Sequence, residues 1–226
     1  TVGWSAAAAE AHPDWCVRTR EGRIAATSWD DQAGPDAPKP PVQWKHLCPS
    51  GDYHALVRAQ TEELCRLYPV DGFWYDIYQP HVSCWCEGCR RGMAQSGLDA
   101  ENPGDVERFR ALTIERHCED LSALIRRFHP EASIYYNGLT AFGRPQNLRY
   151  RLYRWNTKND LEDLPTTWGG YDKFPLRAKR FLKEGKPIVA MSGKFHTSWG
   201  EFGGFKSPEA LRYEAASMIA FGSRCN

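Results

Sequence analysis

Short apolar segments alternate with amphipathic segments along most of this chain, and this alternation restricts the fold more than any other feature. The apolar segments have the length of buried strands and lie at 72–77, 133–137 and 187–191, with a weaker one at 151–155. Segments with helical spacing of apolar residues lie at 52–68, 105–128, 172–183 and 209–221. Strands and helices that alternate in this way predict an α/β fold with a parallel sheet and crossover helices.

The connections that follow the predicted strands are long and polar, whereas those from helix to strand are short. This asymmetry is typical of a (β/α)8 TIM barrel, whose site lies at the carboxyl ends of its strands. The alternative is a doubly wound sheet, but no Gly-rich phosphate loop follows any strand. The chain opens at 1–5 like the end of a strand, and a strand would begin at 222–226. We therefore predict one domain over 1–226, a partial barrel from about the third strand to the start of the eighth.

Composition restricts the partners and the compartment. The formal net charge of the 226 residues is +1, which gives no support for a nucleic-acid or anionic-membrane partner. No apolar run is long enough to span a bilayer. The eight cysteines are clustered in a fairly large chain, which favours metal binding in a reducing compartment over secreted disulfides. We expect a cytoplasmic protein.

Three cysteines, Cys84, Cys86 and Cys89, lie within six residues, and Cys48 lies upstream. Disulfides in such short loops would be strained, and a soft cation would neutralise the crowded thiolates. Four thiolates around Zn²⁺ form the closed arrangement of a structural site. We predict that these four sulfurs lie within about 4 Å of one another, as Zn–S bonds near 2.3 Å require. The alternative is a set of half-buried cysteines beside a loop. The remaining cysteines are expected to stay outside the cluster: Cys16, Cys65, Cys118 and Cys225.

Carboxylates follow several of the predicted strands. Asp76 ends the apolar run at 72–77, Glu162 lies in the acidic segment after 151–155, and Glu201 lies in the stretch at 196–204. Two carboxylates on opposite sides of a bond are what glycosidic cleavage requires. A structural role as a cap is the alternative for Asp76, and a solvated loop is the alternative for Glu162.

The remaining polar and aromatic residues near these strand ends suit a sugar ligand. Tryptophan rings can stack on a sugar ring, and amide or imidazole groups can hydrogen-bond its hydroxyls. The predicted sugar contacts are Trp74, Asn137, His196 and Trp199. The sequence has no closely spaced histidine pair near these residues, which would indicate a catalytic metal. It also has no Gly-x-Ser-x-Gly motif, which would indicate a serine nucleophile.

Several of these motifs resemble glycoside hydrolase families. Cys48 with Cys84-Trp-Cys-Glu-Gly-Cys89 resembles the zinc-braced segment of family 42 β-galactosidases, in which the fourth strand ends in Asn-Glu; this chain has Tyr-Asp there. The run at 71–76, Asp-Gly-Phe-Trp-Tyr-Asp, is similar to the family 29 α-L-fucosidase strand that ends in the nucleophile, and 161–171 is loosely similar to a later segment of that family. The stretch at 196–204 resembles a glycosyl-hydrolase-like group with fucosidase-like barrels.

The resemblance implies a retaining glycoside hydrolase acting on a fucoside or galactoside-like sugar. Asp76 would be the nucleophile and Glu162 the acid/base, with Glu201 as its competitor. A homo-oligomer formed through domains outside this chain is also expected, because a trimerisation-type domain often follows in the resembling proteins. Two alternatives stay open: a non-catalytic carbohydrate-binding barrel or inactive truncated fragment, and a metal-dependent hydrolase of another class.

Overall fold

The computed structural model describes residues 3, 5–28, 43–77, 83–166, 170–195 and 204–225. The α-helices in these ranges are α1 (Ala6–Ala11), α2 (Asp52–Leu67), α3 (Glu87–Gln95), α4 (Pro103–Phe128), α5 (Pro145–Arg149), α6 (Lys173–Leu182) and α7 (Pro208–Ala220), with 3-10 helices η1 (Pro13–Trp15) and η2 (Leu152–Trp155). The strands are β1 (Ala26–Ser28), β2 (Gln43–Lys45), β3 (Gly72–Tyr75), β4 (Ser133–Tyr136), β5 (Asn159–Glu162), β6 (Ile188–Met191) and β7 (Arg224–Cys225).

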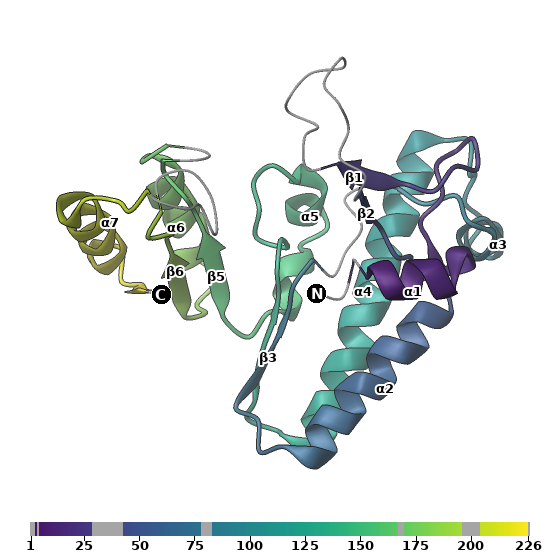
Figure 1. Ribbon diagram of the computed structural model, residues 1–226, viewed down its shortest axis with the longest axis horizontal. Coiled ribbons are helices and arrows are strands. Elements are labelled where there is room, and N and C mark those ends of the chain that lie inside the picture. The colour runs from purple at the N-terminus through teal and green to yellow at the C-terminus, as the bar shows by residue number, and fades with distance from the viewer. Residues whose placement is uncertain are drawn as a thin grey trace.

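Parallel strands form the centre of the molecule, as the sequence predicts. β3 pairs with β4, and β5, β6 and β7 pair in sequence order in a second set. Figure 1 shows α2 and α4 side by side next to β3, and α6 and α7 with β5 and β6 on the opposite side of the molecule. The four predicted helices are confirmed to within two residues at each end, and β7 confirms the strand expected at the end of the chain. No described helix has the length and apolar composition needed to cross a membrane.

The prediction of a strand at 151–155 is wrong. These residues form η2, and the strand is β5, four residues further on. The side chains of Asn156 and Thr157 take the place of a paired strand at the edge of β4, because their oxygens accept hydrogen bonds from the Tyr136 and Ile134 N–H groups at 2.9 and 2.8 Å. The strand itself carries Asn, Asp and Glu, so it lacks the apolar pattern that marks the other strands.

The stretches predicted as loops contain more regular structure than expected. β1 and β2 pair antiparallel within the segment 12–50, which the sequence marks as irregular. The segment that includes Cys89 also forms a helix, α3, whose sequence is short and mostly polar. Residues 29–42, and most of the strand predicted at 1–5, lie outside the described residues.

Alternation along β3 and β4 determines which side chains reach the functional face. Tyr75 and Tyr136 are buried toward the helices, with ring centroids 5.1 Å apart. The Tyr75 hydroxyl lies 2.8 Å from Thr61 Oγ1 on α2, and the Tyr136 hydroxyl donates to the Cys118 carbonyl on α4. Because successive side chains alternate between faces, the residues that follow these two strands emerge on the face away from the helices.

Candidate functional site

Three polar side chains lie at the carboxyl ends of three parallel strands. Asp76 follows β3, Asn137 follows β4, and Glu162 is the last residue of β5. The register of β3 and β4 pairs Tyr75 with Tyr136, so Asp76 and Asn137 come next to each other. Glu162, which the sequence predicts to lie in a loop, is thus at the end of a strand.

Asn137 joins the two carboxylates directly. Its Nδ2 donates to Asp76 Oδ1 at 2.7 Å and to Glu162 Oε2 at 3.2 Å, one bond from each amide hydrogen. The two carboxylate oxygens are therefore no more than 5.9 Å apart, the sum of these two lengths. Carboxyl groups lie about 5–5.5 Å apart in retaining glycosidases and about 6.5–9.5 Å apart in inverting ones. The limit on this one pair of oxygens is compatible with the retaining spacing.

The rest of the Asn137 side chain is also held by the protein. Its Oδ1 accepts a hydrogen bond from the Gly138 N–H at 2.8 Å, and the Tyr135 hydroxyl lies 3.5 Å from the same oxygen. Gly138 has a φ of 84°, in the left-handed region where glycine has no steric cost, so the chain can turn sharply here. A sugar hydroxyl that contacts Asn137 must compete with these bonds.

The backbone turns abruptly after Asp76. Ile77 has a φ of 47°, a region that a β-branched side chain rarely adopts. Such a conformation costs about 1–3 kcal/mol and occurs most often at functional sites. This strain directly follows the proposed nucleophile and fixes the direction in which the chain leaves β3.

A half-buried arginine that sequence reasoning missed acts on Glu162 electrostatically. Arg144 lies in the segment after β4, and its burial, followed by repulsion from Arg110, lowers its pKa to about 10, while Glu162 opposes this shift. The site thus combines two carboxylates with a cation. Arg144 stands in a polar loop that gives no motif, so only the folded chain reveals its place.

Trp74 lies on the same face as Asp76, two residues earlier in β3. Its ring centroid is 4.6 Å from that of Tyr135, and 39% of the residue is exposed, which leaves ring surface available for stacking. The Lys158 Nζ lies 5.9 Å from the ring centroid. The other predicted site residues lie outside the described residues: His196, Trp199 and Glu201.

A second polar cluster, also missed in the sequence, follows β6. The Lys206 Nζ lies 2.9 Å from Glu214 Oε2 and 3.0 Å from Ser192 Oγ, and the Ser192 hydroxyl also bonds to Glu214. The Lys206 and Glu214 side chains are almost fully buried. Phe195 and Phe205 form a β-bridge beside it. Through Ser192, this ion pair joins the middle of α7 and the segment before it to the end of β6.

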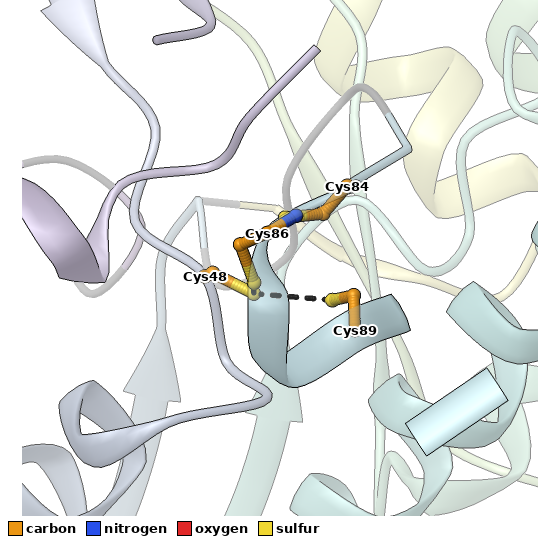
Figure 2. A group of neighbouring side chains, drawn as sticks. All are labelled: Cys48, Cys84, Cys86 and Cys89. Atoms are coloured by element: carbon orange, nitrogen blue, oxygen red, sulfur yellow. Dashed lines mark hydrogen bonds between the residues drawn. The ribbon is translucent and has the colours of Figure 1, made fainter. Parts of the chain in front are cut away.

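The four predicted metal ligands converge, as Figure 2 shows for Cys48, Cys84, Cys86 and Cys89. All four sulfurs lie within 4.8 Å of one another. Cys48 Sγ is 3.5 Å from Cys89 Sγ and 3.7 Å from Cys86 Sγ. Tetrahedral Zn–S bonds near 2.3 Å would draw the sulfurs to within about 4 Å, slightly closer than this limit. The cluster could hold a metal ion.

Backbone N–H groups favour the thiolate form of these cysteines. The Arg18 and Cys86 N–H groups donate to Cys84 Sγ at 3.5 and 3.4 Å, and the Ser50 N–H donates to Cys48 Sγ at 3.4 Å. Cys86 is also the N-cap of α3, where the helix dipole favours negative charge. These donors suit a site that must hold several negative sulfurs in a small volume.

The thiols also share protons with one another. Hydrogen bonds with Cys48 lower the pKa of Cys84 and Cys86. The partners are affected in the opposite sense, because a hydrogen bond with Cys84 raises the pKa of Cys48, and one with Cys48 raises that of Cys89. Metal binding would require these cysteines to be deprotonated, so it would release the protons that the cluster still holds.

Close packing holds the cysteine cluster against α4. Val17, Met93 and Phe109 are among the buried residues that surround the cysteines. A Cβ on Gly92 would lie 2.6 Å from the Phe109 ring, so glycine is required for α3 to approach α4 this closely. The other cysteines remain outside the cluster, as predicted, and Cys65 and Cys118 are buried on α2 and α4.

A buried histidine on α4 fixes the turn after Cys48. The His117 Nε2–H donates to the Pro49 carbonyl, and its ring lies 3.7 Å from that of His54. Burial, followed by the effect of His54, lowers the pKa of His117 from 6.5 to about 3. The folded protein thus holds His117 neutral over a range in which the unfolded chain binds a proton.

This depressed pKa predicts an acid-dependent loss of stability. Between pH 6.5 and about 3 only the unfolded state protonates His117, so stability decreases as the pH falls, by up to ~1.4 kcal/mol per pH unit. We expect His117→Gln, which keeps a neutral donor, to flatten this dependence in urea unfolding measured from pH 7 to 4. The exposed His12→Gln variant should keep the wild-type slope, and a His117→Gln variant that also keeps it would contradict this assignment.

The fold is that of glycoside hydrolases among solved structures. The α-L-fucosidase isoenzyme 2 from Paenibacillus thiaminolyticus has a TM-score of 0.82 with 34% sequence identity over 99% of this chain. β-Galactosidases from Bacillus circulans sp. alkalophilus and Halorubrum lacusprofundi have TM-scores of 0.66 and 0.64 over 99% of the chain, at 13% and 12% identity, so they show the fold alone. The resemblance to fucosidase and β-galactosidase structures that the sequence indicates is thus confirmed.

The chain spans 32% of the fucosidase structure and 38% and 41% of these two β-galactosidase structures. No protein-family model matches the sequence, and no curated protein matches it at a significant level. The likeness therefore covers almost all of this chain but only about a third of the fucosidase structure.

Proposed function

We propose that this chain is part of a (β/α)8 barrel of a retaining glycoside hydrolase that cleaves a fucoside or galactoside-like sugar. The observation that carries the proposal is the Asn137 amide, which donates to Asp76 Oδ1 and Glu162 Oε2 together and holds these two oxygens within 5.9 Å of each other. Two carboxylates at this spacing, at the carboxyl ends of parallel strands, match the geometry of a double-displacement site. The likeness to an α-L-fucosidase supports the fucoside as the first substrate class.

In the proposed mechanism Asp76 attacks the anomeric carbon while protonated Glu162 donates its proton to the leaving oxygen. The result is a glycosyl ester on Asp76 and a free alcohol. Glu162, now ionised, then takes a proton from water, and the resulting nucleophile releases the sugar with net retention. Asn137 holds both carboxylates in register between the two steps, and the strained turn at Ile77 fixes where Asp76 leaves its strand.

Zn²⁺ is the metal that we assign to the cysteine cluster, and its role is structural. Four thiolates complete a tetrahedral shell and leave no position for water or substrate. The site ties the segment after β2 to the N-terminus of α3, on the chain that leaves β3 and Asp76. A metal-dependent hydrolase would need an open coordination position, so this arrangement favours the glycosidase.

The first test is an activity screen of the full-length protein. Nitrophenyl α-L-fucoside and nitrophenyl β-galactoside are the two substrates of choice, and the anomeric configuration of the first product, followed by NMR, should be retained. Turnover of neither substrate, with binding of the free sugars intact, would move the non-catalytic carbohydrate-binding barrel ahead of this proposal.

Removal of the acid/base should affect substrates according to their leaving groups. We expect Glu162→Ala to slow an alkyl glycoside, which needs a proton, by about 10²–10⁴-fold, and a dinitrophenyl glycoside far less. Rates of glycosylation on both substrates, measured in single turnovers, test this. Glu201→Ala is the matched comparison: if it, and not Glu162→Ala, shows this selective loss, Glu201 is the acid/base.

A further inference from the structure

The two proposed catalytic carboxylates stand on opposite sides of a break in the strand hydrogen bonding. β4 pairs with β3, and β5 pairs with β6, but no ladder joins β4 to β5 among the described residues. Asp76 and Asn137 thus belong to one pair of strands, whereas Glu162 belongs to the other set. The Asp76 Oδ1 and Glu162 Oε2 atoms nevertheless lie less than 6 Å apart across this junction. Contacts other than a strand ladder must therefore hold the two sets of strands together.

One buried side chain supplies most of these contacts. Arg177, on α6, is 3% exposed. Its NH1 donates to the Glu162 carbonyl at 2.8 Å, and its NH2 donates to the carbonyl and the hydroxyl of Thr140 at 3.3 and 3.1 Å. Thr140 lies three residues after Asn137. The guanidinium therefore joins the segment that carries Asn137 to the backbone of Glu162.

Further contacts join the same two segments at Asp160, two residues before Glu162 on β5. The Asp160 carbonyl accepts hydrogen bonds from the Tyr135 hydroxyl at 2.5 Å and from Thr140 Oγ1 at 3.2 Å. The Tyr135 hydroxyl also lies 3.5 Å from Asn137 Oδ1. The Tyr135 and Thr140 side chains thus satisfy the Asp160 carbonyl, which a strand ladder with β4 would otherwise satisfy. Arg177 does the same for the Glu162 carbonyl, at the end of β5 that carries the proposed acid/base.

The charge of Arg177 is compensated locally. Its NH1 lies 2.9 Å from Asp163 Oδ2, and the other oxygen of Asp163 lies 3.0 Å from Lys173 Nζ. Asp163 is 1% exposed, so it requires a cationic partner. Because Lys173 would remain paired with Asp163, removal of the arginine does not leave a buried charge without a partner.

We propose that Arg177 is a positioning residue that sets the distance between Glu162 and the Asp76–Asn137 pair. This inference rests on the proposed function, because it assigns Glu162 the proton transfer. The planar guanidinium fork of Arg177 donates to two backbone carbonyls at once, which a lysine ammonium at the end of a flexible chain does not reproduce. Loss of the fork leaves the junction with the Asp160 contacts alone, and the Glu162 carboxylate moves away from Asn137.

The test compares Arg177→Met with Arg180→Met in the full-length protein. Arg180 stands on the same helix and bonds to Glu184 and to the Tyr153 hydroxyl at 2.7 and 2.8 Å, away from the carboxylates. A misplacement of about 1 Å can cost roughly 10²-fold in rate. We therefore expect Arg177→Met to lower kcat for an alkyl glycoside about 100-fold and for a dinitrophenyl glycoside much less, with KM little changed. Arg180→Met should affect both substrates equally.

Crystal structures of the variants decide the inference independently of activity. In Arg177→Met the distance from Asn137 Nδ2 to Glu162 should exceed 3.5 Å, while that to Asp76 stays near 2.7 Å. If both distances are unchanged, or both substrates slow equally, the inference is wrong. An inactive wild-type enzyme would overturn the proposed function, and the distances alone would then decide the role of Arg177. Arg177→Lys, which keeps the charge, serves if the methionine variant does not fold, and wild-type distances in it would equally overturn the inference.

Discussion

Replacement of Asp76 by asparagine is expected to lower turnover of the full-length enzyme by several orders of magnitude. A neutral amide is a poor nucleophile and does not stabilise the positive charge that develops on the sugar. Asn137, which donates to Asp76 at 2.7 Å, would still have an acceptor in the new amide oxygen, so the site should keep its shape. The measurement is kcat with a nitrophenyl glycoside, together with the melting temperature of the variant.

Two further measurements separate attack from mere orientation by Asp76. In Asp76→Gly, azide is small enough to enter the space that the carboxylate occupied, and it should restore turnover and give a glycosyl azide of inverted configuration. Asp71→Asn is the matched control, because Asp71 is exposed just before the start of the same strand, and its backbone carbonyl, which the substitution keeps, accepts a hydrogen bond from the Ser133 N–H at 2.9 Å. Near-native turnover in Asp76→Asn would show that the mechanism is wrong.

The fold was predictable where a single pattern governs each element. β3, β4 and β6 are apolar and flanked by turn residues, and α2 and α4 carry clear apolar stripes, so their bounds follow from the sequence. β5 was missed because its sequence has no apolar run. Its polar side chains are buried with partners from nearby segments: the Asp160 carboxylate, for example, lies 3.2 Å from the half-buried Lys158 Nζ. Only tertiary contacts make a strand of such residues.

The candidate site divides in a similar way. The cysteine spacing alone was sufficient to predict the cluster, because ligand spacing in sequence reflects the coordination geometry. Asp76 and Asn137 follow from strand ends. Arg144 and Arg177 could not be predicted, since an arginine in a loop or on a helix looks the same in sequence whether it is fully solvated or lies within the protein near Glu162.

Serine in place of Cys89 is expected to abolish zinc binding and to lower the melting temperature strongly. Cys89 is 3% exposed, in the first turn of α3 and 3.5 Å from Cys48 Sγ, so the substitution removes one of the four thiolate ligands from the interior of the cluster. Structural Zn²⁺ contributes ~10–16 kcal/mol of binding free energy in zinc-finger peptides. Even a loss of ~4 kcal/mol would lower the melting temperature by on the order of 10 °C in a domain of this size. Zinc content by mass spectrometry and thermal unfolding are the measurements.

The controls for Cys89→Ser distinguish a structural metal from a catalytic one. Cys225→Ser changes an exposed thiol outside the cluster and should keep both zinc and melting temperature. A strong chelator should lower the melting temperature of the wild-type protein to that of Cys89→Ser and leave the variant unchanged. Because the four thiolates leave no open coordination position, kcat measured well below the new melting temperature should survive zinc removal. Loss of activity at once, with the fold intact, would instead place the metal in the chemistry.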